Sequence, residues 1–317
     1  MPQIVTRRVG RTGIPVTSVG LGTAQLGGGG IYELVPEAQG RDTVLRALAL
    51  GIRLVDTAPF YGAGIAEERL GKILQDVDRT SITLATKVGR LVVGPGKVAF
   101  DFSRDGVMRS VEESLRRLDV DHLDIVHIHD PDNHVVQALN EAFPTLADLR
   151  DQGVIGAIGV GMTQWQVPLR FVQETSIDCL VLAGRYTLLE QTGALDTLFP
   201  ECERRNVSVM LGGIYNSGIL ATGAGPNARY EYRSAPPDVL QRVERLSETC
   251  ERHGVPLQVA AVQFPLAHPG VTSIMVGMIS AEEVAALERA LAWNVPAALW
   301  AELREEGLID PLAPVPA

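Results

Sequence analysis

Eight short runs of aliphatic and β-branched residues recur along the chain, each followed by a stretch with the apolar spacing of an amphipathic helix. A parallel strand needs a crossover connection to reach its neighbour, so strands that alternate with helices predict a parallel sheet. Eight such units are the number that closes a (β/α)8 TIM barrel, an α/β fold. The runs are Thr17–Leu21, Arg53–Ala58, Ile82–Val88, Leu123–His129, Ile155–Gly161, Cys179–Ala183, Val207–Gly212 and Val271–Gly277.

The alternative is a doubly wound open sheet, which is expected to place G-x-G-x-x-G after its first strand. Here Gly20 and Gly22 are followed by Gln25 where the third glycine belongs, so the barrel is favoured. The runs Ile4–Val9 and Ile14–Val16 flank a glycine turn and predict a β-hairpin that closes the bottom of the barrel. The whole chain, residues 1–317, is expected to form one barrel domain.

Charge and composition exclude several classes of partner. The chain has 28 basic and 38 acidic residues, a balance of 28 − 38 = −10, and such a chain repels the phosphates of nucleic acids. It shows no secretion signal and no apolar run long enough to span a membrane, so a cytoplasmic protein is expected. Cys179, Cys202 and Cys250 have neither disulfide nor zinc spacing, and no metal site is expected. The sequence leaves the oligomeric state open.

Four polar residues are expected to meet at the mouth of the barrel. Strand alternation predicts that Asp56, Lys87 and His129 face inward near the ends of the second, third and fourth strands. Tyr61 follows Asp56 in a glycine-rich turn and can fold back toward them. His127 shares the face of His129 but lies deeper, so a structural role is expected for it. Barrel enzymes keep their active sites at this end of the strands.

These residue types together suit proton transfer. A lysine ammonium lowers the pKa of a neighbouring phenol, which would make Tyr61 a general acid and base. Asp56 would keep Lys87 charged, and His129 would hydrogen-bond the reacting oxygen. A Schiff-base lyase acting through Lys87 is the alternative, but a neighbouring carboxylate favours the charged form of lysine, which is not nucleophilic.

Three glycine- and proline-rich stretches follow predicted strands and are expected to be loops at the same mouth. They are Gly27–Gly40, Gly89–Phe102 and Asn216–Pro237. Loops at this end of a barrel shape the choice of substrate.

The segments LVDTAPFYG (Leu54–Gly62), ATKVG (Ala85–Gly89) and LDIVHIHD (Leu123–Asp130) resemble the aldo-keto reductase family. Similarity runs from GLGTA (Gly20–Ala24) to VGMISAEE (Val276–Glu283), nearly the whole chain. The resemblance implies a catalytic tetrad and an extended nicotinamide cofactor across the mouth. In that tetrad Tyr61 is the proton donor or acceptor, Lys87 lowers its pKa, Asp56 supports Lys87, and His129 orients the substrate.

The chain departs from the family where the nicotinamide is held. Gly161 and Met162 stand in place of a Ser-Asn pair, Ala183 in place of a glutamine, and Gly212 near the place of a stacking aromatic residue. Arg185, Tyr186, Tyr215 and Asn216 are possible substitutes. The resemblance places the cofactor against Gly22, Thr23, Asp56, Gly161, Tyr186, Tyr215, Asn216, Ser217, Gly218, Leu220, Gly277, Ser280 and Glu283. It places the small-molecule substrate against Tyr61, His129, Asp130 and Trp165.

The sequence after the eighth strand favours NAD, with NADP possible. Members that prefer NADP have a basic residue there, whereas Gly277–Glu288 contains no Lys or Arg and Glu283 occupies the matching position. A carboxylate repels a 2′-phosphate and accepts from a ribose hydroxyl. In the alternative, Glu283 only caps its helix, and Arg229 or Arg233 binds the phosphate.

Three further segments resemble the aldose 1-dehydrogenase branch of the family, which includes D-threo-aldose (L-fucose) dehydrogenases and has pyridoxal 4-dehydrogenases and L-galactose dehydrogenases as relatives. They are HDPD (His129–Asp132), AGRYTLLEQ (Ala183–Gln191) and NSGILA (Asn216–Ala221). This resemblance implies NAD(P)-dependent oxidation of the C1 hydroxyl of an aldose such as L-fucose, D-arabinose or L-galactose to the lactone. A pyridoxal 4-dehydrogenase, a general aldehyde or ketone reductase and a cofactor-sensing binding module stay open as alternatives.

Residues of two kinds are available near the mouth for the two substrates. Pyridoxal needs an aromatic wall, for which the candidates are Phe60, Trp165, Tyr230 and Tyr232. A sugar needs hydrogen-bonding groups, for which the candidates are Asp130, Asn133, Gln164 and Asn216.

Overall fold

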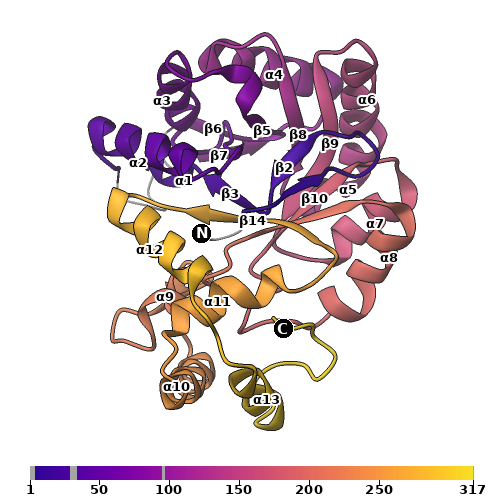
Figure 1. Cartoon of the computed structure of the whole chain (residues 1–317). Coiled ribbons are helices and arrows are strands. Elements are labelled where there is room, and N and C mark those ends of the chain that lie inside the picture. The colour runs from indigo at the N-terminus through magenta and orange to yellow at the C-terminus, as the bar shows by residue number, and fades with distance from the viewer. Residues whose placement is uncertain (1–3, 29–33, 95–96, 317) are drawn as a thin grey trace.

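Eight parallel strands close into a barrel in the computed structural model, which describes residues 4–28, 34–94 and 97–316 (Figure 1). In chain order they are β3 (Val19–Gly22), β4 (Leu54–Asp56), β5 (Thr83–Val88), β8 (Leu123–His129), β9 (Ile155–Met162), β10 (Cys179–Ala183), β11 (Ser208–Gly212) and β14 (Val271–Gly277). Each pairs with the next, and β14 pairs with β3. The predicted (β/α)8 TIM barrel is therefore confirmed.

Several strand boundaries differ from the predicted runs, and one run is divided between two strands. The run Thr17–Leu21 is divided, because β2 (Pro15–Thr17) ends at Thr17 and the barrel strand β3 begins at Val19. The Thr17 hydroxyl donates to the Val19 carbonyl and accepts from the backbone N–H groups of Arg53 and Leu54. Thr17 thus ties the end of β2 to the start of β4.

The helices surround the barrel (Figure 1). The longer ones are α2 (Glu37–Ala49), α3 (Ile65–Leu74), α4 (Arg104–Leu118), α6 (Phe143–Asp151), α7 (Gln166–Glu174), α8 (Phe199–Arg205), α10 (Pro237–Arg252), α11 (Leu257–Leu266), α12 (Ala281–Ala292) and α13 (Ala297–Glu305). The short ones are α1 (Ala24–Gly27), α5 (Val135–Gln137) and α9 (Ile219–Thr222), the 3-10 turns Arg79–Ser81 and Asp132–His134, and the π-helical turns Ala138–Ala142 and Ala194–Leu198. Within the described residues, no helix is long and apolar enough to cross a membrane.

Alternation along the strands produces two apolar layers. Residues that face inward, such as Leu54, Ile125 and Met210, form the core inside the barrel. Their neighbours, such as Val55 and Val126, face outward and pack under the helices. The polar residues of the mouth therefore lie on top of a dry interior.

A hairpin of β1 (Thr6–Arg8) and β2 closes one end of the barrel, as predicted. Val9 and Val16 join the apolar core inside the barrel. The backbone N–H of Gly10 donates to the hydroxyl of Ser208 at the start of β11, 2.8 Å away. The hairpin thus covers the N-terminal ends of the strands and leaves the other end for the site.

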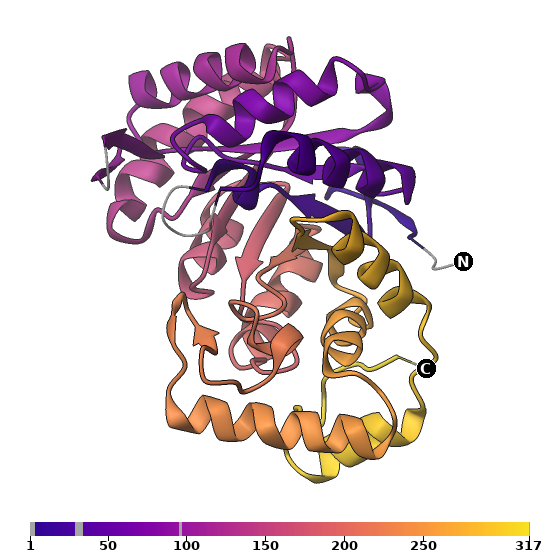
Figure 2. The same cartoon turned by 90° about the vertical axis from the view of Figure 1, so that its left-hand side faces the viewer.

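The long loops contain strands that the sequence analysis did not predict. β6 (Arg90–Gly94) pairs with β7 (Lys97–Phe100) in the loop after β5, and β12 (Arg229–Tyr230) pairs with β13 (Arg233–Ser234) in the loop after β11. Figure 2 shows the second pair lying between the barrel and α10. Of the predicted loop Gly27–Gly40, residues 29–33 lie outside the described part of the chain.

Candidate active site

Lys87 and Asp56 form a buried ion pair at the ends of adjacent strands β5 and β4. The Lys87 Nζ lies 2.9 and 2.7 Å from the two carboxylate oxygens of Asp56 and 2.7 Å from the Thr57 carbonyl oxygen. Burial alone would lower the pKa of Lys87, but the negative charge of Asp56 and the hydroxyl of Tyr61 together raise it. Lys87 therefore stays an ammonium ion, which argues against the Schiff-base alternative.

Tyr61 is held over this pair by a close approach of two backbone segments. A Cβ atom on Gly27 would lie 2.4 Å from the Tyr61 carbonyl carbon, and one on Gly62 would lie 2.1 Å from the Gly27 carbonyl oxygen. Gly62 also has a φ of +63°, which favours glycine. The Lys87 Nζ lies 4.8 Å from the centroid of the Tyr61 ring.

The pKa of the Tyr61 hydroxyl is raised to about 12. Burial is the main cause, and Lys87 opposes it through its charge and a hydrogen bond. The prediction that Lys87 acts to lower this pKa is correct for the contribution of Lys87 but wrong for the net shift, because burial outweighs it. At neutral pH Tyr61 is a phenol that has a proton to donate.

His129 ends β8 and is 7% exposed. Burial, with the positive charges of Lys87 and Arg90, holds its pKa well below the usual range, so the imidazole is neutral. The ring centroids of His129 and Tyr61 lie 6.2 Å apart, and the two rings meet edge to face. His129 can therefore donate a hydrogen bond to a substrate oxygen beside Tyr61 without being charged.

His127 lies deeper inside the barrel, as the alternation predicted. It is fully buried, and its pKa falls to about 3 because burial and the charge of Lys87 disfavour the imidazolium. A Cβ atom on Gly159 would lie 2.1 Å from the His127 Nδ1, so glycine at that position makes room for the ring. His127 supports the floor of the site.

A polar rim borders His129, and the sequence analysis found only part of it. Asp130, predicted to contact substrate, forms an ion pair with Arg90, which was missed. Arg90 follows Lys87 by three residues and begins β6. Gly89 directly follows β5 and predicts a turn at the mouth, and this signal could have pointed to Arg90. Trp165 lies half-buried after β9, with its indole against Gly193.

A floor of glycines leads from β14 to Asp56. Gly277 pairs with Gly22, and Gly22 pairs with Asp56 in the next strand. The Thr23 hydroxyl donates to the Asp56 carbonyl oxygen at 2.9 Å and fixes the end of β4. The side chain of Gln25, which was not predicted for the site, covers Gly277. A Cβ atom on Gly277 would lie 2.0 Å from the Gln25 Nε2. Gly22 therefore adds no side chain to this edge of the mouth, whereas the Gln25 side chain covers Gly277.

Three residues predicted to bind cofactor have other roles. Tyr186 is fully buried in an aromatic cluster with Phe199, Phe264 and His268 under the helices, so its assignment was wrong. Leu220 is also fully buried, and its backbone N–H donates to the Tyr215 carbonyl. Asn216 accepts from the Thr187 hydroxyl and donates to the Gly184 carbonyl, so its amide organises the loop.

The other predicted cofactor residues lie near strand ends. Gly161 faces the barrel interior, between the side chains of Val181 and His127. Ser217 and Gly218 precede α9, and Ser280 caps α12 by accepting from the Glu283 N–H at 3.2 Å. Burial raises the pKa of Tyr215, with a further contribution from the charge of Glu283 in the first turn of α12.

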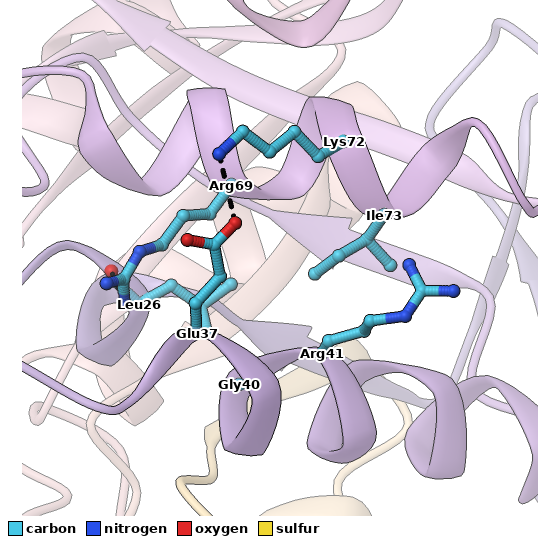
Figure 3. Close-up of a pocket in the computed structure, with 7 residues that line it drawn as sticks. All are labelled: Leu26, Glu37, Gly40, Arg41, Arg69, Lys72 and Ile73. Carbon is cyan, nitrogen blue, oxygen red and sulfur yellow. Dashed lines mark hydrogen bonds and ion pairs between the residues drawn. The ribbon is translucent and has the colours of Figure 1, made fainter.

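A small cavity of about 60 Å³ lies outside the barrel, between α2 and α3 (Figure 3). Its charged residues are already paired. Lys72 contacts Glu37 at 2.9 Å, and Arg69 donates to the carbonyl oxygens of Leu26 and Val35. This cavity therefore belongs to the framework that fixes the segment before α2. Across the described ranges, no group of three or more His, Cys, Asp or Glu residues is arranged to hold a metal ion.

A barrel with this ammonium, phenol and imidazole at its mouth defines a class of protein, the oxidoreductases that transfer a proton at the oxygen of a carbonyl or hydroxyl group while its carbon exchanges a hydride. Residues 18–306 match the Aldo/keto reductase family, and the chain belongs to it. It is therefore an oxidoreductase that acts on CH–OH or carbonyl groups and uses a nicotinamide nucleotide, NAD or NADP.

Several relatives and solved structures resemble the chain over nearly its whole length. It is 36% identical to pyridoxal 4-dehydrogenase of Microbacterium luteolum, covering 96% of this chain and 98% of the relative. It is 35% identical to D-threo-aldose 1-dehydrogenase of a Pseudomonas species, covering 94% and 96%. The structure of glycerol dehydrogenase from Gluconobacter oxydans is similar with a TM-score of 0.78, at 26% identity and 96% and 98% coverage.

Proposed function

We propose that this protein oxidises the C1 hydroxyl of an aldose to the lactone, with NAD as the preferred cofactor. The observation that supports it is the polar rim of Arg90 and Asp130 directly beside His129, which offers hydrogen bonds to a polyhydroxylated substrate. The similarity to D-threo-aldose 1-dehydrogenase and, at 32% identity, to L-galactose dehydrogenase of Arabidopsis thaliana supports the same class.

The arrangement of the aromatic residues favours a sugar over pyridoxal. One face of Phe60 is covered by the guanidinium of Arg90, 3.8 Å from the ring centroid. Trp165 packs against Gly193, and the Tyr230 hydroxyl donates to Glu190. Phe60, Trp165 and Tyr230 are thus already engaged within the chain.

The four residues divide the chemistry among them. A nicotinamide held at the mouth beside Gly22 and Thr23 would supply the acceptor for the hydride that leaves C1 of the sugar. His129 donates a hydrogen bond to the C1 oxygen, and Tyr61 receives the proton of that hydroxyl. Lys87 stabilises the negative charge on the Tyr61 oxygen, and Asp56 keeps Lys87 charged and oriented. Asp130 and Trp165 border the sugar.

The high pKa of Tyr61 predicts opposite pH dependence for the two directions of reaction. Oxidation needs the phenolate, whose fraction rises with pH at every value below a pKa of about 12. We expect kcat/KM for aldose oxidation to rise by up to about tenfold per pH unit between about pH 7 and 10. Reduction uses the phenol, and we expect its rate to stay nearly constant there. An oxidation profile that levels off below about pH 9 would show a different proton acceptor.

A substrate panel tests the proposed function. NADH formation is followed with L-fucose, D-arabinose, L-galactose and pyridoxal, and lactone is identified as the product. Turnover of an aldose supports the proposal, and turnover of pyridoxal alone overturns the substrate class. Reduction of simple aldehydes alone would indicate a general reductase. Tight nucleotide binding without turnover of any compound would indicate a binding module.

Glu283 provides a test of cofactor preference. Its carboxylate accepts from the Ile279 backbone N–H at 2.7 Å, so it caps α12 as well as adding negative charge near the mouth. Glu283→Gln keeps an acceptor for that bond and removes the charge. We expect the ratio of kcat/KM for NAD⁺ over NADP⁺ to fall by about 5- to 10-fold.

The matched control is Glu282→Gln, on the same turn of the helix and also exposed. It should leave the ratio unchanged. An equal ratio in both variants and the wild type would mean that Glu283 acts only as a helix cap.

A further inference from the structure

Three side chains from three separate strand ends meet beside His129. The guanidinium carbon of Arg90 lies 3.8 Å from the centroid of the Phe60 ring, and Arg90 Nη1 forms an ion pair with Asp130 Oδ2. The same oxygen of Asp130 lies 3.7 Å from His129 Nε2, and the Phe60 and His129 rings meet edge to face at 5.9 Å. Asp130 thus connects Arg90 to His129, the residue proposed to bind the reacting oxygen.

The backbone places both charged residues. Gly89 has a φ of +94°, and the ring of Phe102 fills the space where its Cβ would lie, 2.1 Å away. This turn ends β5 and directs Arg90 to the mouth. Asp130 has a φ of +46°, and its N–H donates to the Gly161 carbonyl at 2.9 Å. Each residue is thus held by its own backbone turn. The positions of the two side chains therefore do not depend on their mutual ion pair alone.

Both side chains keep unused hydrogen-bonding groups. Arg90 Nε is buried and has no partner among the described residues. Among the described residues, the side chain of Asp130 accepts a hydrogen bond through Oδ2. Its other carboxylate oxygen, Oδ1, can therefore accept another. The side chains of Arg90 and Asp130 are 27% and 23% exposed, so a molecule in the mouth can reach them.

We propose that Arg90, together with Asp130, binds the hydroxyl groups next to the reacting carbon and so selects polyhydroxylated substrates. This assignment rests on the proposed aldose dehydrogenase function. A hydroxyl both donates and accepts, and a guanidinium beside a carboxylate offers the complementary donor and acceptor. Asp130 neutralises the guanidinium, which disfavours an anionic substrate, and Arg90 covers the Phe60 face that an aromatic substrate would stack on.

Arg90→Gln tests this proposal, with kcat and KM measured on two substrates. The first is the aldose that the wild type oxidises fastest, and the second is propanal, reduced with NADH, which has no hydroxyl groups. We expect kcat/KM for the aldose to fall by about 10- to 100-fold, mainly through KM. We expect propanal reduction to change by less than about threefold. The 2-deoxy analogue of the aldose should be a poor substrate of the wild type and lose little more in the variant.

Arg104→Gln is the matched control, because Arg104 is an exposed arginine on α4 that pairs with Asp148 away from the mouth. It should leave both substrates unchanged, and thermal unfolding of each variant checks the fold. Arg90→Lys retains the charge but not the planar fork, and should not restore aldose binding. Equal loss on aldose and propanal, or no loss on either, overturns this assignment alone. A wild type that oxidises no aldose overturns the proposed function and this assignment together.

Discussion

Replacing Tyr61 by Phe is expected to lower kcat by about 10³-fold or more in both directions. The substitution removes the hydroxyl of the ring that lies over Lys87 beside His129, and general acid–base catalysis contributes about 10²- to 10⁴-fold. The dissociation constant for NADH should change little, because the ring stays in place between the same neighbours. Initial rates of aldose oxidation and aldehyde reduction, with NADH binding followed by fluorescence, measure both effects.

Tyr186→Phe is the matched control. It removes a phenolic hydroxyl that is buried and has no partner within the described residues, in the aromatic cluster under the helices. Activity should therefore stay within about twofold of the wild type. If Tyr61→Phe kept more than about a tenth of the wild-type rate, another group would have to supply the proton.

Replacing Lys87 by Met is expected to reduce both stability and activity. Breaking a buried ion pair by removing one partner costs about 3–5 kcal/mol, because the Asp56 carboxylate is left in a dry environment. The Tyr61 phenolate would also lose the positive charge that stabilises it, so oxidation should fall by about 10²-fold or more. Urea unfolding and initial rates report the two effects separately.

The double variant Lys87→Met, Asp56→Asn separates stability from catalysis. Removing both charges eliminates the unpaired carboxylate, and we expect the free energy of unfolding to recover by more than half. Activity should stay as low as in the single variant, because no cation remains beside Tyr61. Recovery of activity along with stability would show that Lys87 acts only as a structural partner of Asp56.

The barrel and the meeting of Asp56, Lys87 and His129 at its mouth could be predicted because buried strands have a regular signature. β10 and β14 begin and end where the runs Cys179–Ala183 and Val271–Gly277 predicted. Alternation also predicts which side chains face inward, so the positions of Asp56, Lys87 and His129 followed from sequence alone. These features depend on the alternation of side chains along each strand and not on contacts between distant segments.

The parts that were missed depend on contacts between distant segments. The strands β12 and β13 are two residues long and lie in a polar loop, so no apolar alternation marks them. The strands β6 (RLVVG) and β7 (KVAF) are apolar in sequence but have no buried residue, and the sequence analysis assigned both to a loop. Tyr186 lies three residues after the end of β10, and sequence did not indicate that its ring turns outward to Phe264. The net pKa of Tyr61 depends on how far loops bury it, which residue types and spacing do not show.

The contact between Gly27 and Gly62 links two loops that belong to different βα units. Any insertion or side chain that moves the segment after β3 also moves Tyr61, the proposed proton carrier. The first two units therefore form one module whose sequence can vary little without loss of turnover. In the described structure no glycine of the loops after β5 and β11 makes such a backbone contact with Tyr61, although Tyr232, between β12 and β13, contributes to the raised pKa of Tyr61. Laboratory evolution toward new substrates should therefore accumulate changes in those two loops and spare the first two.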